Sequence, residues 1–157
     1  MKQKIIEIIK EEKDASIRFE VLEKFYHKVD CESDVQLLID ILKDDYDPCV
    51  RHEAAAQLFR VAERKPLLLQ NLKSKAIETL LDKAYNDVST VVRHESIEAL
   101  GYIADLNALK DLEHFSKSDN LDIHSTAHIA LKTAKRRLEM NLTADEVTNN
   151  IIATWTK

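Results

Sequence analysis

The nine residues VRHEAAAQL (50–58) return as VRHESIEAL (92–100), and this repetition decides the fold. Five of the nine positions are identical, including the Val-Arg-His-Glu that opens both copies. The same template matches two weaker copies, IRFEVLEKF (17–25) and IHSTAHIAL (123–131). The four copies start 33, 42 and 31 residues apart. Such spacings are typical of solenoids that are built from pairs of helices.

The first, fifth and ninth positions of the template predict the buried face of a helix. They are apolar or small in every copy, and a step of four residues places them along one stripe. The stripe consists of Ile17, Val21 and Phe25; Val50, Ala54 and Leu58; Val92, Ser96 and Leu100; and Ile123, Ala127 and Leu131.

A second helix is expected before each template helix, since each preceding segment has apolar residues at helical intervals. In the third repeat this partner is expected over 66–84, where Pro66 marks a break and a longer helix absorbs the wide spacing. Asp47 and Ser89 are the expected N-caps of the second and third template helices, with Pro48 at the first helical position. The other three partners are expected at IIEIIK from Ile5, VQLLIDILK from Val35 and LNALKDLEHF from Leu106.

Composition agrees with an all-helical fold, because the 157 residues are 45% hydrophobic and include one Gly and two Pro. We therefore predict an all-α, right-handed α-solenoid that forms one domain over residues 1–157. Its four repeats are expected at about 1–31, 32–64, 65–105 and 106–140. The capping-box pattern of Thr143 and Glu146 predicts a further helix over 143–155, which seals the stack or contacts a second chain.

Charge and hydropathy narrow the classes of partner. A net charge of -5 argues against nucleic acid and anionic membrane surfaces, and favours a basic protein or peptide. The chain has no apolar stretch of the length needed to span a bilayer, and its first residues lack the apolar core of a secretion signal. Cys31 and Cys49 are not clustered, which favours a reducing compartment and predicts a cytoplasmic protein.

The template resembles a known repeat. The pattern Asp/Ser-x-x-Val-Arg-x-x-Ala, which closes on ALGYIAD in the third copy, is similar to the HEAT-like repeats of bilin lyase subunits and related proteins. The resemblance extends from about Ile5 to about Met140, and its strongest matches are the second and third copies. It implies a solenoid with a concave binding surface and by itself implies no particular activity.

The His-Glu pairs add a second resemblance. His52-Glu53 and His94-Glu95 resemble the iron-binding pairs in one half of deoxyhypusine hydroxylase, a di-iron enzyme built from HEAT-like repeats. The resemblance implies that His52, Glu53, His94 and Glu95 bind metal, and that a homodimer completes a di-iron site. The implied activity is oxygen-dependent hydroxylation of an amine-bearing substrate. The outer copies lack the pair, and only half of the length of that enzyme is present.

Equal template positions in adjacent repeats are expected to be neighbours. This expectation places His52 beside His94 and Glu53 beside Glu95, a set of ligands that suits iron, manganese or zinc. Glu98 lies one turn after His94, where it is expected to orient the imidazole or to bind a cationic substrate. Glu53 is expected either to bind the metal or to receive that cationic side chain. The alternative is a metal-free adaptor that binds a peptide or helix of another protein.

The second template position holds Arg18, Arg51 and Arg93. A row of arginines suits phosphate binding, but the acidic net charge argues against a nucleic acid. We expect these arginines to bind acidic turn residues of neighbouring repeats, such as Asp47 and Asp87.

Overall fold

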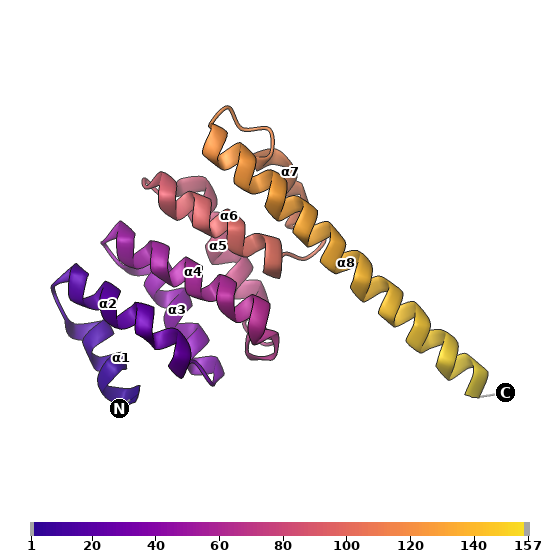
Figure 1. The fold of residues 1–157 in the computed structure, drawn as a ribbon, viewed down its shortest axis with the longest axis horizontal. Helices are drawn as coiled ribbons and strands as arrows, with labels where there is room; N and C mark the ends of the chain where they lie inside the picture. The colour runs from indigo at the N-terminus through magenta and orange to yellow at the C-terminus, as the bar shows by residue number, and fades with distance from the viewer. Residues whose placement is uncertain (1, 156–157) are drawn as a thin grey trace.

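The computed structural model describes the backbone of residues 2–155 and the side chains of residues 2–140. Every regular element in the described part of the chain is helical (Figure 1). The α-helices are α1 (Lys2–Glu11), α2 (Ala15–Phe25), α3 (Glu32–Asp44), α4 (Pro48–Arg64), α5 (Lys73–Asn86), α6 (Thr90–Ile103), α7 (Leu109–Phe115) and α8 (Leu121–Trp155). Short 3-10 helices lie at Tyr26–Lys28 and Pro66–Leu69.

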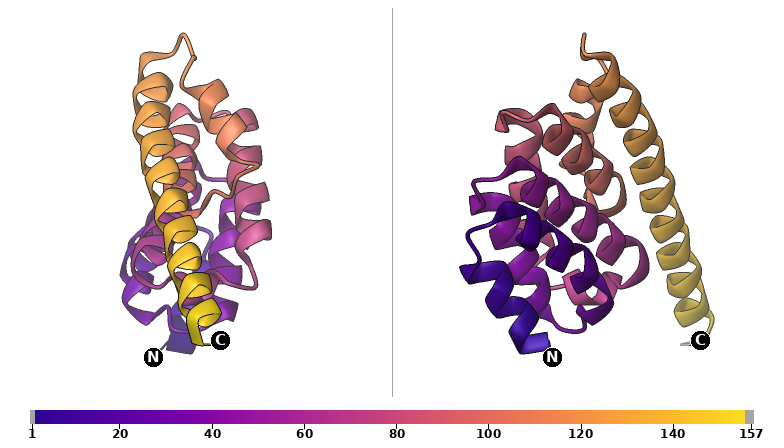
Figure 2. Two further views of the ribbon diagram at one scale, coloured as in Figure 1. Left: turned by 90° about the vertical axis from the view of Figure 1, so that its right-hand side faces the viewer. Right: turned by 60° about the vertical axis from the view of Figure 1, so that its left-hand side comes forward.

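The helices form two layers of a solenoid. One layer consists of α2, α4, α6 and α8, which carry the template, and the other consists of their partners α1, α3, α5 and α7 (Figures 1 and 2). Within the first layer α4 packs between α2 and α6, and α6 packs against α8. The predicted all-α solenoid of helix pairs is therefore confirmed.

The predicted buried stripe is confirmed in the middle of the stack. All of its members in α4 and α6 are buried, and they belong to one continuous hydrophobic core except for the buried Ser96. The ends of the stack differ, because they have a neighbour on one side only. Ile17 in α2 is 42% exposed, and Leu131 in α8 is half-buried.

The start of α4 is formed as its sequence predicts. Pro48 is the first helical residue, and the Asp47 carboxylate accepts hydrogen bonds from the backbone N–H groups of Cys49 (2.8 Å) and Val50 (3.3 Å). Ser89 occupies the N-cap position of α6, but its side chain makes no capping bond.

The wide spacing before the third copy is absorbed differently from our expectation. The partner helix α5 begins at Lys73 and has 14 residues, against 13 in α3, so it is not the long helix expected over 66–84. The additional residues extend α4 to 17 residues and form the 3-10 helix at Pro66–Leu69. Pro66 does end α4, because it lacks a backbone donor.

The end of the chain also differs from the expectation of a separate helix over 143–155. The backbone continues as α8 from Leu121 to Trp155 and runs past the end of α6 (Figure 1). No Gly or Pro interrupts this segment, so nothing in the sequence forces a break before Thr143. Whether the segment seals the stack depends on side chains outside the described residues. In the described part of the chain, no helix combines the length and hydropathy needed to cross a membrane.

Candidate functional site

The expected metal ligands lie on the layer of template helices, and a contact between α4 and α6 brings two of them together. His52 Nε2 lies 3.2 Å from Glu95 Oε2. The hydrogen bond to Glu95 raises the pKa of His52, and partial burial opposes the shift without cancelling it. His52 therefore pairs with a carboxylate of the next repeat.

His94 repeats this arrangement one helix further along. Its Nδ1 lies 2.8 Å from Thr126 Oγ1 on α8, and its Nε2 lies 3.8 Å from Glu98 Oε2 on its own helix. In both cases the third template position contacts the fourth position of the next repeat. The contacts are thus diagonal, and they replace the contacts between equal positions that the repeat pattern led us to expect.

Glu53 is held apart from this group. It is buried, and its Oε1 accepts hydrogen bonds from Arg60 Nη1 (2.9 Å) and Gln57 Nε2 (3.1 Å). Gln57 also donates to the backbone carbonyl of Leu22, which connects Glu53 to α2. Glu53 is not among the residues whose ligand atoms converge in the described part of the chain.

Three residues of α6 have the geometry of a metal site. His94, Glu95 and Glu98 each offer a ligand atom, and these atoms lie within 4.8 Å of one another. The contact between His94 Nδ1 and Thr126 directs Nε2 towards Glu98, as an outer hydrogen bond orients a ligating imidazole. One nitrogen and two carboxylates suit iron, manganese or zinc. His52 joins this group only through Glu95.

A second cluster of potential ligands carries its own cation. Asp30, Cys31 and Asp34 lie close together, but Lys2 Nζ is 2.6 Å from Asp30 Oδ1 and 2.5 Å from Asp34 Oδ2. The lysine ammonium therefore occupies the position between the two carboxylates and links α1 to α3.

A groove crosses the start of the template helices. It has a volume of about 670 Å³ and is lined by α2, α4 and α6, including the apolar side chains of Phe19, Pro48 and Val91. Glu20 and Asp47 add two carboxylates, and no Lys or Arg is among its lining residues. His52 lies at the groove as well. Sequence reasoning missed this groove. The one available signal was Val91, an apolar residue outside the predicted buried stripe, and the structure leaves it 56% exposed.

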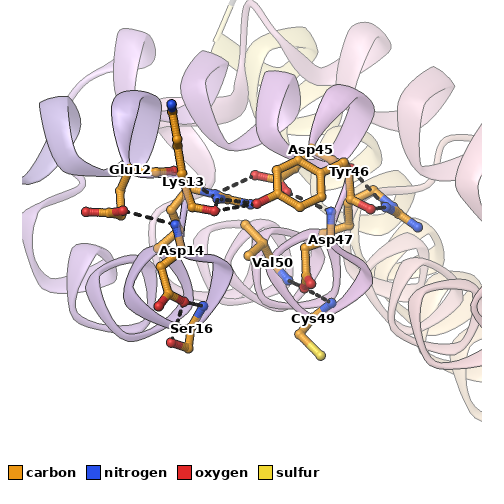
Figure 3. A network of polar contacts seen from close by, with 11 residues as sticks. Glu12, Lys13, Asp14, Ser16, Asp45, Tyr46, Asp47, Cys49 and Val50 are labelled. Atoms are coloured by element: carbon orange, nitrogen blue, oxygen red, sulfur yellow. Dashed lines mark hydrogen bonds and ion pairs between the residues drawn. The ribbon is translucent and has the colours of Figure 1, made fainter.

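Two of the three arginines at the second template position, Arg18 and Arg51, bind an acidic residue of the next repeat. Arg93 does not, and the expectation is wrong for it, because its hydrogen bond goes to Thr90 of its own helix. Arg18 donates from Nε and Nη2 to Asp45 (3.1 and 2.9 Å), and Arg51 donates from the same atoms to Asp87 (2.7 and 2.8 Å). Asp87 was expected in this role, but the first partner is Asp45 instead of Asp47, whose carboxylate caps α4. Figure 3 shows Asp45 and Asp47 in this network.

Each bound arginine also fastens the turn that precedes its own helix. Arg18 Nη1 donates to the carbonyls of Glu12 and Lys13, and Arg51 Nη1 donates to those of Asp45 and Tyr46. Burial acts to raise the pKa of Asp87, but hydrogen bonds from Arg51 and from the Ser89 N–H outweigh it and lower the pKa. The arginines thus stabilise the stack.

Residues 35–132, more than half of the chain, match the family of HEAT repeats. The chain belongs to the HEAT-repeat family. The match covers the second and third helix pairs, α7 and the first part of α8, and leaves the first helix pair outside. No curated protein matches the chain. The family match carries the architecture of the HEAT repeats and no activity.

Proposed function

We propose that this HEAT-repeat protein is a protein-interaction module that binds a basic polypeptide segment in the groove across α2, α4 and α6. The groove itself is the observation that carries the proposal. Three successive repeats contribute apolar side chains to one open surface of about 670 Å³. Concave and grooved surfaces that extend over several repeats are the binding surfaces of solenoid proteins.

The charges at the groove favour a cationic partner. Glu20 and Asp47 line it, without a lysine or arginine to offset them, and the whole chain has a net charge of -5. A segment that combines apolar side chains with Lys or Arg is complementary to such a surface. The unpaired cysteines Cys31 and Cys49 suit a reducing compartment, which supports a cytoplasmic setting.

The test is selection of binders from a displayed library of random peptides, followed by affinity measurement on single peptides. We expect the selected peptides to be rich in Lys, Arg and large apolar residues. Glu20→Lys should weaken their binding by about tenfold or more, because like charges are then opposed. Glu23→Lys is the matched control, since Glu23 is an exposed residue of the same helix outside the groove.

Cys49 offers an independent readout, because it is exposed and lines the groove. In a Cys31→Ser chain it is the single remaining thiol. A bound peptide should slow alkylation of Cys49, and a bulky adduct on Cys49 should prevent binding. Peptides that bind equally well to Glu20→Lys and to the adduct would place the binding surface elsewhere and refute the proposal.

A second candidate function is metal binding by His94, Glu95 and Glu98. The support is the convergence of three ligand atoms within 4.8 Å, with His94 oriented by Thr126. The resemblance to an iron hydroxylase favours iron, with a homodimer to complete a di-iron site and hydroxylation of an amine-bearing substrate as the reaction. In that reaction Glu98 or Glu53 would receive the cationic side chain.

Metal binding is tested by equilibrium dialysis of the purified protein against Fe²⁺, Mn²⁺ and Zn²⁺ without oxygen. We expect one ion per chain, and loss of that ion in His94→Ala. His27→Ala is the control, since His27 is an exposed histidine remote in sequence from the cluster. The di-iron version further requires a solution mass of two chains. Equal metal content in both variants would refute the site.

A further inference from the structure

We propose that Arg93, at the junction between α6 and α8, is the centre of a binding site for an oxyanion, either a carboxylate or a phosphate. The two preceding repeats hold an aspartate carboxylate on the equivalent arginine. The third repeat has the arginine, but the turn before the fourth template helix has no aspartate at the position that would bind it. This site is separate from the groove and from the His94 cluster, so the inference does not depend on the proposed function.

The lost carboxylate is identified by the turns that precede the template helices. One position in each turn lies six residues before the second template position, and its side chain accepts the backbone N–H two residues later. This position holds an acidic residue in three repeats and Ser118 in the fourth. The four bonds are Asp14 N–H to Glu12 (3.0 Å), Asp47 N–H to Asp45 (2.9 Å), Ser89 N–H to Asp87 (2.9 Å) and Asn120 N–H to Ser118 (3.2 Å).

The aspartates at this position have a second role that serine does not fulfil. Asp45 binds Arg18 of the preceding repeat, and Asp87 binds Arg51, in both cases through two carboxylate oxygens. Ser118 has the same position in the turn before α8, so it is the residue that stands where a partner of Arg93 would be expected. Its single hydroxyl completes the turn, but it has no pair of oxygens for a guanidinium.

Arg93 has the contacts expected of an arginine without its anion. Within the described residues its one hydrogen bond runs from Nη2 to Thr90 Oγ1 of its own helix, at 3.0 Å. Its Nε is buried and has no partner among those residues. In Arg18 and Arg51 the same nitrogen donates to an aspartate. A buried donor without a partner is costly, and a planar guanidinium binds carboxylate or phosphate through two parallel bonds.

The test compares urea unfolding of four chains in chloride, acetate and inorganic phosphate at equal ionic strength and pH. The unfolding midpoint of the wild-type protein should rise with acetate or phosphate. The anion with the larger effect shows whether the site prefers a carboxylate or a phosphate. Arg93→Gln should lose this response. Ser118→Asp should also lose it, because the variant provides the carboxylate permanently, and its midpoint in chloride should exceed that of the wild type. Ser125→Asp, which adds the same charge at an exposed position of α8, should respond as the wild type does.

A spectroscopic measurement separates binding from a general effect of salt. In a ¹⁵N spectrum, phosphate or acetate should shift one arginine Nε–Hε signal, and that signal should be missing from Arg93→Gln. An equal rise of the midpoint in all four chains, or a Ser118→Asp chain no more stable than Ser125→Asp, would overturn the proposal.

Discussion

The junctions between repeats are held together in two different ways. Between the first and second repeats, and between the second and third, a buried arginine binds an aspartate through two hydrogen bonds. Between the third and fourth repeats the arginine lacks that partner, and α6 and α8 instead approach each other closely at Gly101. A Cβ atom at Gly101 would lie 2.9 Å from Ala130 Cα, a distance that real Cβ contacts do not show.

The comparison shows that one repeat template supports two kinds of junction. An ion pair orients a helix relative to the next turn, but it requires both partners and excellent geometry once it is buried. Packing of small residues brings the backbones of α6 and α8 together, and the hydrogen bond between His94 and Thr126 takes the place of a buried ion pair there. Residues at equal template positions therefore differ in importance, according to the junction in which they lie.

The difference between the two junctions is tested most directly by the same substitution at two equivalent arginines. Arg51→Met leaves the Asp87 carboxylate buried without its partner, so we expect a loss of about 3–5 kcal/mol in the free energy of unfolding. Arg93→Met leaves no carboxylate behind, so we expect a loss below about 1 kcal/mol. Urea unfolding at neutral pH measures both, and equal losses would show that the two junctions do not differ.

The sequence predicts the helices well, because the relevant interactions are local. The template stripe, the Asp47 cap and the break at Pro66 depend on residues that are close in sequence. The structure confirms the cap and the break, and it confirms the buried stripe in α4 and α6. The pairing of Arg51 with Asp87 was also predictable, since it repeats along the chain.

The diagonal contacts were not predictable. His52 pairs with Glu95, one template position beyond its equivalent His94, and the repeat spacing does not specify how the side chains of adjacent helices are set against one another. Glu53 and Glu95 follow the same Val-Arg-His, but Gln57 and Arg60, which bind Glu53 within its own helix, are replaced by Ala99 and Tyr102 after Glu95. The different environment of Glu53 was therefore readable from the residues that follow it, whereas the contact between His52 and Glu95 depends on how α4 packs against α6.

The packed junction is tested by adding one methyl group. Gly101→Ala normally favours a helix, but here the new Cβ meets backbone atoms of Ala130, which have no flexible side chain to move. We expect a net loss of about 1–3 kcal/mol in unfolding free energy. Lys132→Ala, at an exposed position of α8, should change it by less than about 0.5 kcal/mol. A Gly101→Ala chain that is as stable as the wild type would show that α6 and α8 separate easily.

The smallest expected effect on stability comes from the ion pair between His52 and Glu95, which joins α4 to α6, and this effect depends on pH. Glu95 raises the pKa of His52, so the pair stabilises the fold fully below the ordinary pKa of about 6.5. This contribution disappears as the pH rises through the raised pKa of the folded state, because the imidazole then loses its charge. Glu95→Gln should therefore cost about 0.2–1 kcal/mol more at pH 6 than at pH 9.

Urea unfolding at these two pH values measures the difference, and Glu78→Gln, an exposed carboxylate on α5, is the control. A cost of Glu95→Gln that is the same at both pH values would mean that His52 and Glu95 interact through a neutral hydrogen bond. In that case the buried ionic contact between the second and third repeats among the described residues would be the pair of Arg51 in α4 with Asp87 in the turn before α6.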